Sequence, residues 1–71
     1  MPNKVLVDID LVVLGEHLSK EEGRPVGEDE VRQWLRDARF VPHKGMWIVS
    51  EADLGQLDPS EVRSIEDAPE P

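Results

Sequence analysis

The basic side chains between residues 32 and 44 have the types and spacing to contact a polyanion. Arg32, Arg36 and Arg39 recur at i, i+4 and i+7, so a helix would carry them on one face. Guanidinium groups suit phosphate oxygens or guanine edges, because they donate two parallel hydrogen bonds. The same face could instead be solvated and paired with Glu28 and Asp29, and such exposed pairs contribute little. DNA contact, a solvated face and protein contact all stay open.

Two aspartates, Asp8 and Asp10, interrupt the apolar run VLVDIDLVVL at residues 5–14. This D-x-D spacing resembles the nucleophile strand of haloacid-dehalogenase-type phosphatases, in which the first Asp attacks a phosphoryl group and the second acts as acid/base. That fold also needs a parallel sheet, a downstream lysine and a further acidic pair, which 71 residues do not supply. We therefore interpret both aspartates as side chains on the solvent-exposed face of a strand.

The two histidines do not have the spacing of a metal site. A turn and the main helix separate His17 from His43, and neither lies in an E-x-x-H or H-x-x-x-H pattern. The sequence contains no cysteine, so it offers no disulfide and no thiolate ligand. It also shows no nucleophile–base constellation. We expect a protein that is not an enzyme and that has no metal site and no cofactor.

The charge of the chain is acidic and unevenly distributed. Sixteen acids and eight bases give a formal net charge of −8, and residues 58–71 carry −4 of it. This excess opposes generic affinity for nucleic acid, because Lys and Arg supply most non-specific binding. No apolar run reaches the ~18 residues of a membrane span. We expect a cytoplasmic protein that makes no contact with a membrane.

Hydrophobic periodicity predicts the element order β-α-α-β-β-α. The odd positions from Val5 to Val13 are apolar, which predicts a strand over residues 4–13. Helices are expected over 14–23 and 28–39, joined by GRPVG, with Trp34 in the core. A hairpin follows over 40–50, where Trp47 should cover the helices. Ser50 should cap a last helix.

The last segment, DPSEVRSIEDAPEP at 58–71, reads as an acidic tail that contains three prolines. It has few large apolar residues and cannot bury enough surface to order itself. Asp58 could cap a short turn with Pro59 in its first position. We expect a single domain over 1–57 and a flexible tail over 58–71, disordered at least from Ala68.

Four short patterns occur in a fixed order: VRQWLR at 31–36, RFVP at 39–42, GMWI at 45–48 and SE at 50–51. Together they resemble the excisionase and MerR-like winged helix-turn-helix group. In that group the second helix carries a V-R-x-W-[VL]-R core and a wing with Gly precedes an aromatic strand. The resemblance covers about residues 14–57 and implies a small α+β, winged-helix-like domain. The N-terminal strand and the acidic tail lie outside it.

The resemblance implies a small regulatory module that binds double-stranded DNA. Helix 28–39 would then be the recognition helix, with Arg32, Gln33 and Arg36 toward the major groove and Arg39 nearby. Lys44 at the wing tip would reach a phosphate or the minor groove. These five residues are the predicted nucleic-acid-binding residues.

The acidic charge supports a different function on the same scaffold. The first helix holds Glu16, Glu21 and Glu22, and the tail adds more acids. Such a module could present carboxylates to a basic protein partner, as an inhibitor or antirepressor does, without binding DNA. An arginine stripe ringed by carboxylates would favour this function, whereas a contiguous positive patch would favour DNA. The edge of the N-terminal strand could also pair with a second copy of the chain.

Overall fold

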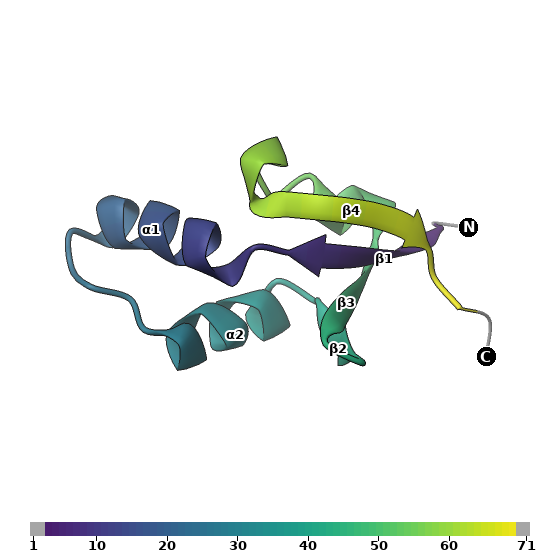
Figure 1. The fold of residues 1–71 in the computed structure, drawn as a ribbon, viewed down its shortest axis with the longest axis horizontal. Coiled ribbons are helices and arrows are strands. Elements are labelled where there is room, and N and C mark those ends of the chain that lie inside the picture. Colours follow the sequence, from purple (N-terminus) through teal and green to yellow (C-terminus); the bar gives the residue numbers. More distant parts are fainter. Residues whose placement is uncertain (1–2, 70–71) are drawn as a thin grey trace.

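A four-stranded antiparallel sheet with the strand order β2-β3-β1-β4 forms one end of the molecule (Figure 1). The computed structural model describes residues 3–69. These residues form a small, elongated α+β domain that measures 38 × 20 × 20 Å along its principal axes. Its strands are β1 Lys4–Ile9, β2 Val41–His43, β3 Met46–Ser50 and β4 Val62–Asp67. The helices among these residues are α1 Leu11–Glu22, α2 Glu28–Asp37 and the short α3 Glu51–Leu54, followed by a 3-10 turn, η1 Pro59–Glu61.

The N-terminal strand is shorter than expected, because the chain turns into α1 at Asp10. The Asp10 carboxylate accepts hydrogen bonds from the backbone N–H groups of Val12 and Val13, at 3.1 and 3.2 Å, and caps the helix. The predicted strand over 4–13 is therefore wrong after Ile9. Leu11, Val12 and Val13 are helical, so α1 starts three residues earlier than predicted. The alternation of apolar residues continues through Leu11 and Val13, but Asp10 acts as an N-cap there and starts a helix.

Helix α1 ends where the sequence indicated. Gly23 takes the left-handed conformation, with φ of 69°, and its N–H donates to the carbonyl of Ser19. Glycine adopts this conformation without the steric cost that a Cβ brings. The Ser19 hydroxyl accepts from the N–H of Val26 at 3.0 Å. The connection therefore folds back on α1 and places α2 beside it (Figure 1).

The hairpin lies within the predicted range, and its turn is tight. His43 pairs with Met46, so Lys44 and Gly45 form a two-residue loop with φ of 48° and 81°. Positive φ at both positions is typical of the turn whose twist matches that of paired strands. Pro42 lies in β2, which is an edge strand. Proline has no N–H to donate, and at the open edge of a sheet no neighbouring strand needs one. Ser50 caps α3 as predicted.

The segment predicted as a flexible tail contains an edge strand, β4, at residues 62–67. Strand β4 pairs with β1, with Val7 opposite Ile65 and Leu6 opposite Glu66. Asp58 caps η1 with Pro59 in its first position, as predicted. The prediction of a tail over 58–67 is therefore wrong. Disorder was predicted from Ala68 onward, but the backbone N–H of Ala68 donates a hydrogen bond to the carbonyl of Lys4. Residues 70 and 71 lie outside the described residues.

Strand β4 also occupies the edge of β1 that was considered as a possible site for pairing with a second copy of the chain. Strand β1 is an interior strand, paired with β3 on one side and β4 on the other. No free edge of β1 is left for a second copy, because residues 62–67 occupy it. The predicted order β-α-α-β-β-α likewise lacks this fourth strand.

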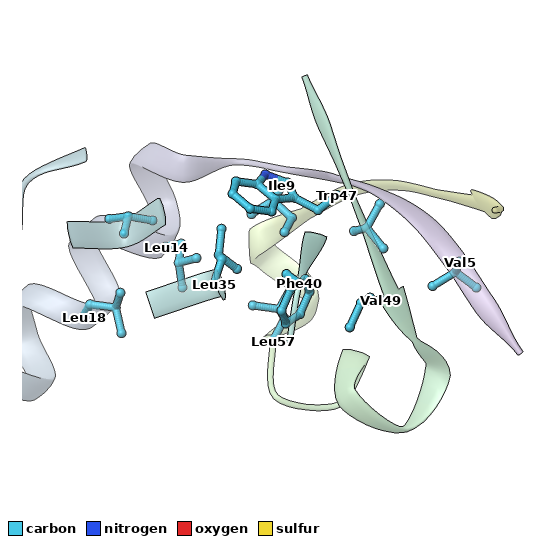
Figure 2. Close-up of a cluster of buried hydrophobic side chains, with 11 residues drawn as sticks. Val5, Ile9, Leu14, Leu18, Leu35, Phe40, Trp47, Val49 and Leu57 are labelled. Atoms are coloured by element: carbon cyan, nitrogen blue, oxygen red, sulfur yellow. The ribbon is translucent and has the colours of Figure 1, made fainter. Parts of the chain in front are cut away.

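One apolar cluster joins the sheet to the two helices (Figure 2). Its least exposed large members are Phe40, Leu14, Leu35, Val7, Val31 and Val49. Trp47 is buried in the same cluster, whereas Trp34 is partly buried and packs against it. The odd positions of β1 face this core, as the alternation predicts.

Candidate interaction surface

Two of the five predicted DNA-binding residues are engaged by acids of their own helix. The guanidinium of Arg32 lies 3.3 Å from the Glu28 carboxylate and 3.7 Å from that of Asp29. The side-chain amide of Gln33 donates to Asp37 at 3.0 Å. These neighbours stand three or four positions away, the spacing at which helix side chains meet. A phosphate would have to compete with these carboxylates for both side chains.

The other three predicted residues are exposed at the opposite end of α2 and in the hairpin turn. Arg36 lies in the last turn of α2 and Arg39 directly after the helix, whereas Lys44 lies in the β2–β3 turn. Within residues 3–69 none of the three makes an ion pair. Arg39 has φ of 73°, a left-handed conformation in which glycine is usual after a helix. The free cations therefore lie away from the N-terminal turn of α2.

The N-terminal turn of α2 is acidic. Glu28, Asp29 and Glu30 occupy it, and the side chain of Asp29 is fully exposed. Carboxylates are favoured there, because the helix macrodipole places partial positive charge at this end. Residues 16–30 together contain six acids and two bases, a net charge of −4. The acidic excess at this end therefore lies in α1, the connection and the first turn of α2, and the arginines in the rest of α2 reduce it to −3 over residues 11–37.

Arg24 sits between the two helices and is surrounded by acids. Its guanidinium lies 2.7 Å from the Glu30 carboxylate and 3.1 Å from that of Glu22. The hydrogen bond from Arg24 lowers the pKa of Glu30, and the hydrogen bond to Glu30 raises the pKa of Arg24. All three side chains are about half exposed, so these pairs contribute little to stability. Their consequence is electrostatic, because both carboxylates lie at Nη2 of Arg24 and offset its charge.

A mostly apolar groove of about 490 Å³ runs along the outer surface where α1 and α2 pack. Its apolar lining consists of Leu11, Val12, Gly15, Val26 and Val31. Its polar lining consists of Glu16, Ser19, Lys20 and Glu28. Gly15 brings the helices close, since a Cβ there would lie 3.3 Å from a methyl of Val31. Val12 is 72% exposed, the highest value among the exposed large apolar residues of the described chain.

The remaining candidate residues have structural partners. The Asp10 carboxylate caps α1 and also lies 3.3 Å from the guanidinium of Arg63. A bulge in β4 gives Arg63 this position, because Asp8 pairs with Ser64 and Ile9 with Val62. Asp8 is half-buried on the interior strand β1. His17 lies against Glu61, and within residues 3–69 no three His, Asp or Glu side chains gather as metal ligands.

Sequence reasoning missed the groove and the role of Asp10. The signal for Asp10 was present, because an aspartate directly before an apolar helix is a common N-cap. The groove had no such signal, since it depends on the approach of α1 to α2 at Gly15.

None of the helices within residues 3–69 has the length and apolar composition needed to cross a membrane.

Comparisons with known proteins found no family model that matches the chain, and no similar curated protein or solved structure.

Proposed function

We propose that the protein is a non-catalytic interaction module that presents an acidic surface to a basic protein partner. The observation that carries this proposal is the acidic N-terminal turn of α2, where Arg32 is paired with Glu28 and Asp29. In a helix-turn-helix protein the N-terminal residues of the recognition helix contact the bases. Here that position would bring three carboxylates toward the phosphates of a duplex. The same carboxylates attract Lys and Arg of another protein.

The long-range charge acts in the same direction. A net charge of −8 on 71 residues repels a polyanion and accelerates the approach of a basic partner. The attraction would be strongest at low ionic strength, because the Debye length shortens to about 8 Å at physiological salt. Residues 16–30, with a net charge of −4, give a basic partner a concentrated acidic surface on α1 and the first turn of α2.

Binding of a labelled Lys- and Arg-rich peptide at ~50 mM salt, followed by fluorescence anisotropy, tests this proposal. The wild-type chain should bind the peptide, and binding should weaken as salt rises. A variant with Glu28→Gln and Asp29→Asn should bind several-fold more weakly. The matched control, Glu51→Gln with Glu66→Gln, removes two exposed carboxylates at the sheet end. Equal losses in both variants would contradict a surface located on α2.

DNA binding by a winged-helix-like arrangement is the second candidate, and one observation favours it. Arg36, Arg39 and Lys44 are exposed cations that no carboxylate of residues 3–69 engages. Arg39 also keeps a long cationic side chain at a left-handed position where glycine would be less strained. A strained, exposed and unengaged residue is consistent with a binding role.

The same anisotropy measurement with a labelled mixed-sequence duplex tests the second candidate. Salt-dependent binding at ~50 mM salt that falls in Arg36→Gln and Lys44→Gln variants would support DNA contact. Absence of duplex binding at that salt would remove this function, since even weak phosphate contacts are measurable there.

A further inference from the structure

We infer that the groove between α1 and α2 docks a segment of the partner protein that places an apolar side chain beside lysines or arginines. This inference rests on the proposed function and locates the binding site for it. Three observations support it: an apolar lining, an exposed valine on that lining, and an acidic surround.

The exposure of Val12 marks the groove as a contact surface. Val12 is 72% exposed and lines the groove together with Leu11, so two adjacent apolar side chains form a contiguous apolar surface there. The absence of a side chain at Gly15 lets α1 approach Val31 of α2 closely. An apolar side chain entering here would cover Val12 and the exposed parts of Leu11 and Val26. Removal of this surface from water is favourable by about 25 cal/mol per Å².

The polar residues at the groove determine which apolar segment is accepted. Glu16 and Glu28 lie on its lining, with Lys20 as the single base there. Asp29, whose side chain is fully exposed, continues the acidic surface beyond Glu28 on α2. An apolar residue flanked by Lys or Arg therefore meets complementary charge on both sides, whereas an acidic segment meets repulsion. An amphipathic helix with a basic polar face satisfies both requirements and binds grooves of this kind.

Two peptides of identical composition separate the groove from the acidic surface as a whole. The first is a Lys/Leu helix whose leucines recur at i, i+3, i+4 and i+7, so that they form one apolar face. The second has the same residues in scrambled order and therefore the same charge. Both are labelled and titrated with the full chain at ~50 mM salt. The amphipathic peptide should bind at least several-fold more tightly, and it should shift the amide resonances of Val12, Gly15 and Val26.

A Val12→Asn variant tests the apolar contact directly. It should weaken binding of the amphipathic peptide about five-fold, because the contact of one valine is lost. Val41→Asn is the matched control, since Val41 is 55% exposed on β2, away from the groove. Binding of the scrambled peptide should be the same for both variants, and their circular dichroism should match that of the wild type.

The outcomes distinguish the two proposals. Equal affinity for both peptides, or equal loss from Val12→Asn and Val41→Asn, would overturn the groove while leaving the acidic interaction surface intact. Failure of both peptides to bind at low salt would overturn the groove together with the proposed function. Shifts at Val12 and Gly15 that grow with protein concentration alone would assign the groove to a second copy and overturn its assignment to a partner.

Discussion

His17 Nδ1 lies 2.6 Å from Glu61 Oε2, and this contact joins α1 to the 3-10 turn 44 residues later in the chain. The other Glu61 oxygen, Oε1, accepts from the backbone N–H of Asp58 at 2.6 Å. The Glu61 side chain is only 6% exposed, so both of its oxygens are satisfied within the protein. One buried carboxylate thereby holds the start of β4 against the helical layer.

Replacement of Glu61 by alanine should lower the free energy of unfolding by about 2 kcal/mol, because it removes a capping box and a hydrogen bond to His17. Glu61→Gln should cost less, since glutamine also completes a capping box. Urea denaturation followed by circular dichroism measures both values. The control is Glu66→Gln on the exposed part of β4, which should change stability by less than about 0.5 kcal/mol. Equal stability of the alanine variant and this control would contradict the role of Glu61.

The cap at Asp10 should make stability depend on acid pH. The hydrogen bond from the Val13 N–H is the main cause that lowers the pKa of Asp10, with smaller support from Arg63 and Val12. The hydrogen bond from the Ser60 side chain is the main cause that lowers the pKa of Asp58. Their contribution is fully present above the unfolded aspartate pKa of about 3.9. It is lost as the pH falls through the lower folded-state values.

The urea midpoint should therefore fall as the pH drops below about 4. Asp10→Asn keeps a good N-cap acceptor but does not titrate, so its midpoint should fall less over the same range. Asp10→Ala should be less stable than Asp10→Asn at pH 7, because the N–H groups of Val12 and Val13 then lose their acceptor. Parallel pH curves for wild type and Asp10→Asn would show that the cap is not the source of the dependence.

Phe40 should be among the most sensitive core positions. It is fully buried and joins α2 to β2 within the apolar cluster that contains Leu35, Val49 and Leu57 (Figure 2). Phe40→Leu should lower the free energy of unfolding by about 1–2 kcal/mol, since it removes apolar volume that the site refills only in part. Urea denaturation followed by tryptophan fluorescence measures the change. The neighbouring exposed Val41→Thr should stay within about 0.5 kcal/mol of wild type.

Much of the fold follows from local signals in the sequence. The stripe of Val31 and Leu35 is buried as a helix face, Gly23 ends α1, and Lys44 with Gly45 closes the hairpin. The boundary at Asp10 was lost because Leu11 and Val13 satisfy a strand alternation and a helix equally well. Only the aspartate before them separates the two, through a hydrogen bond that forms when the helix starts.

Strand β4 and the binding surface depend on contacts that sequence composition does not report. The segment VRSIED has one partly buried residue, Val62, and its other side chains are exposed, so it carries almost no apolar signal. It is ordered by pairing of its backbone with β1, for which side-chain polarity is nearly irrelevant. Likewise the pairing of Arg32 with Glu28 follows from helix spacing, but the groove beside Gly15 requires the packed helices.

A chain that ends at Glu61 tests the role of β4. Strand β1 would lose its ladder from Val5 to Ile9 and the cover that Val62 gives to the core. Five paired positions at about 0.5–1.5 kcal/mol per hydrogen bond predict a loss of roughly 3 kcal/mol or more. For a chain of this size such a loss removes much of the total stability. Circular dichroism and urea denaturation should show a shifted or absent cooperative transition.

The truncated chain should also self-associate, because the exposed edge of β1 offers unpaired backbone groups to a second copy. Sedimentation would detect this as a mass that rises with concentration, whereas the full chain has β4 on that edge. Ile65→Thr is the control: Ile65 is 52% exposed and threonine keeps a β-branched side chain in the strand, so stability should be nearly unchanged. A flexible tail predicts the opposite result, since its removal would leave both the unfolding transition and the mass unaltered. The truncated chain therefore decides whether residues 62–67 act as a strand.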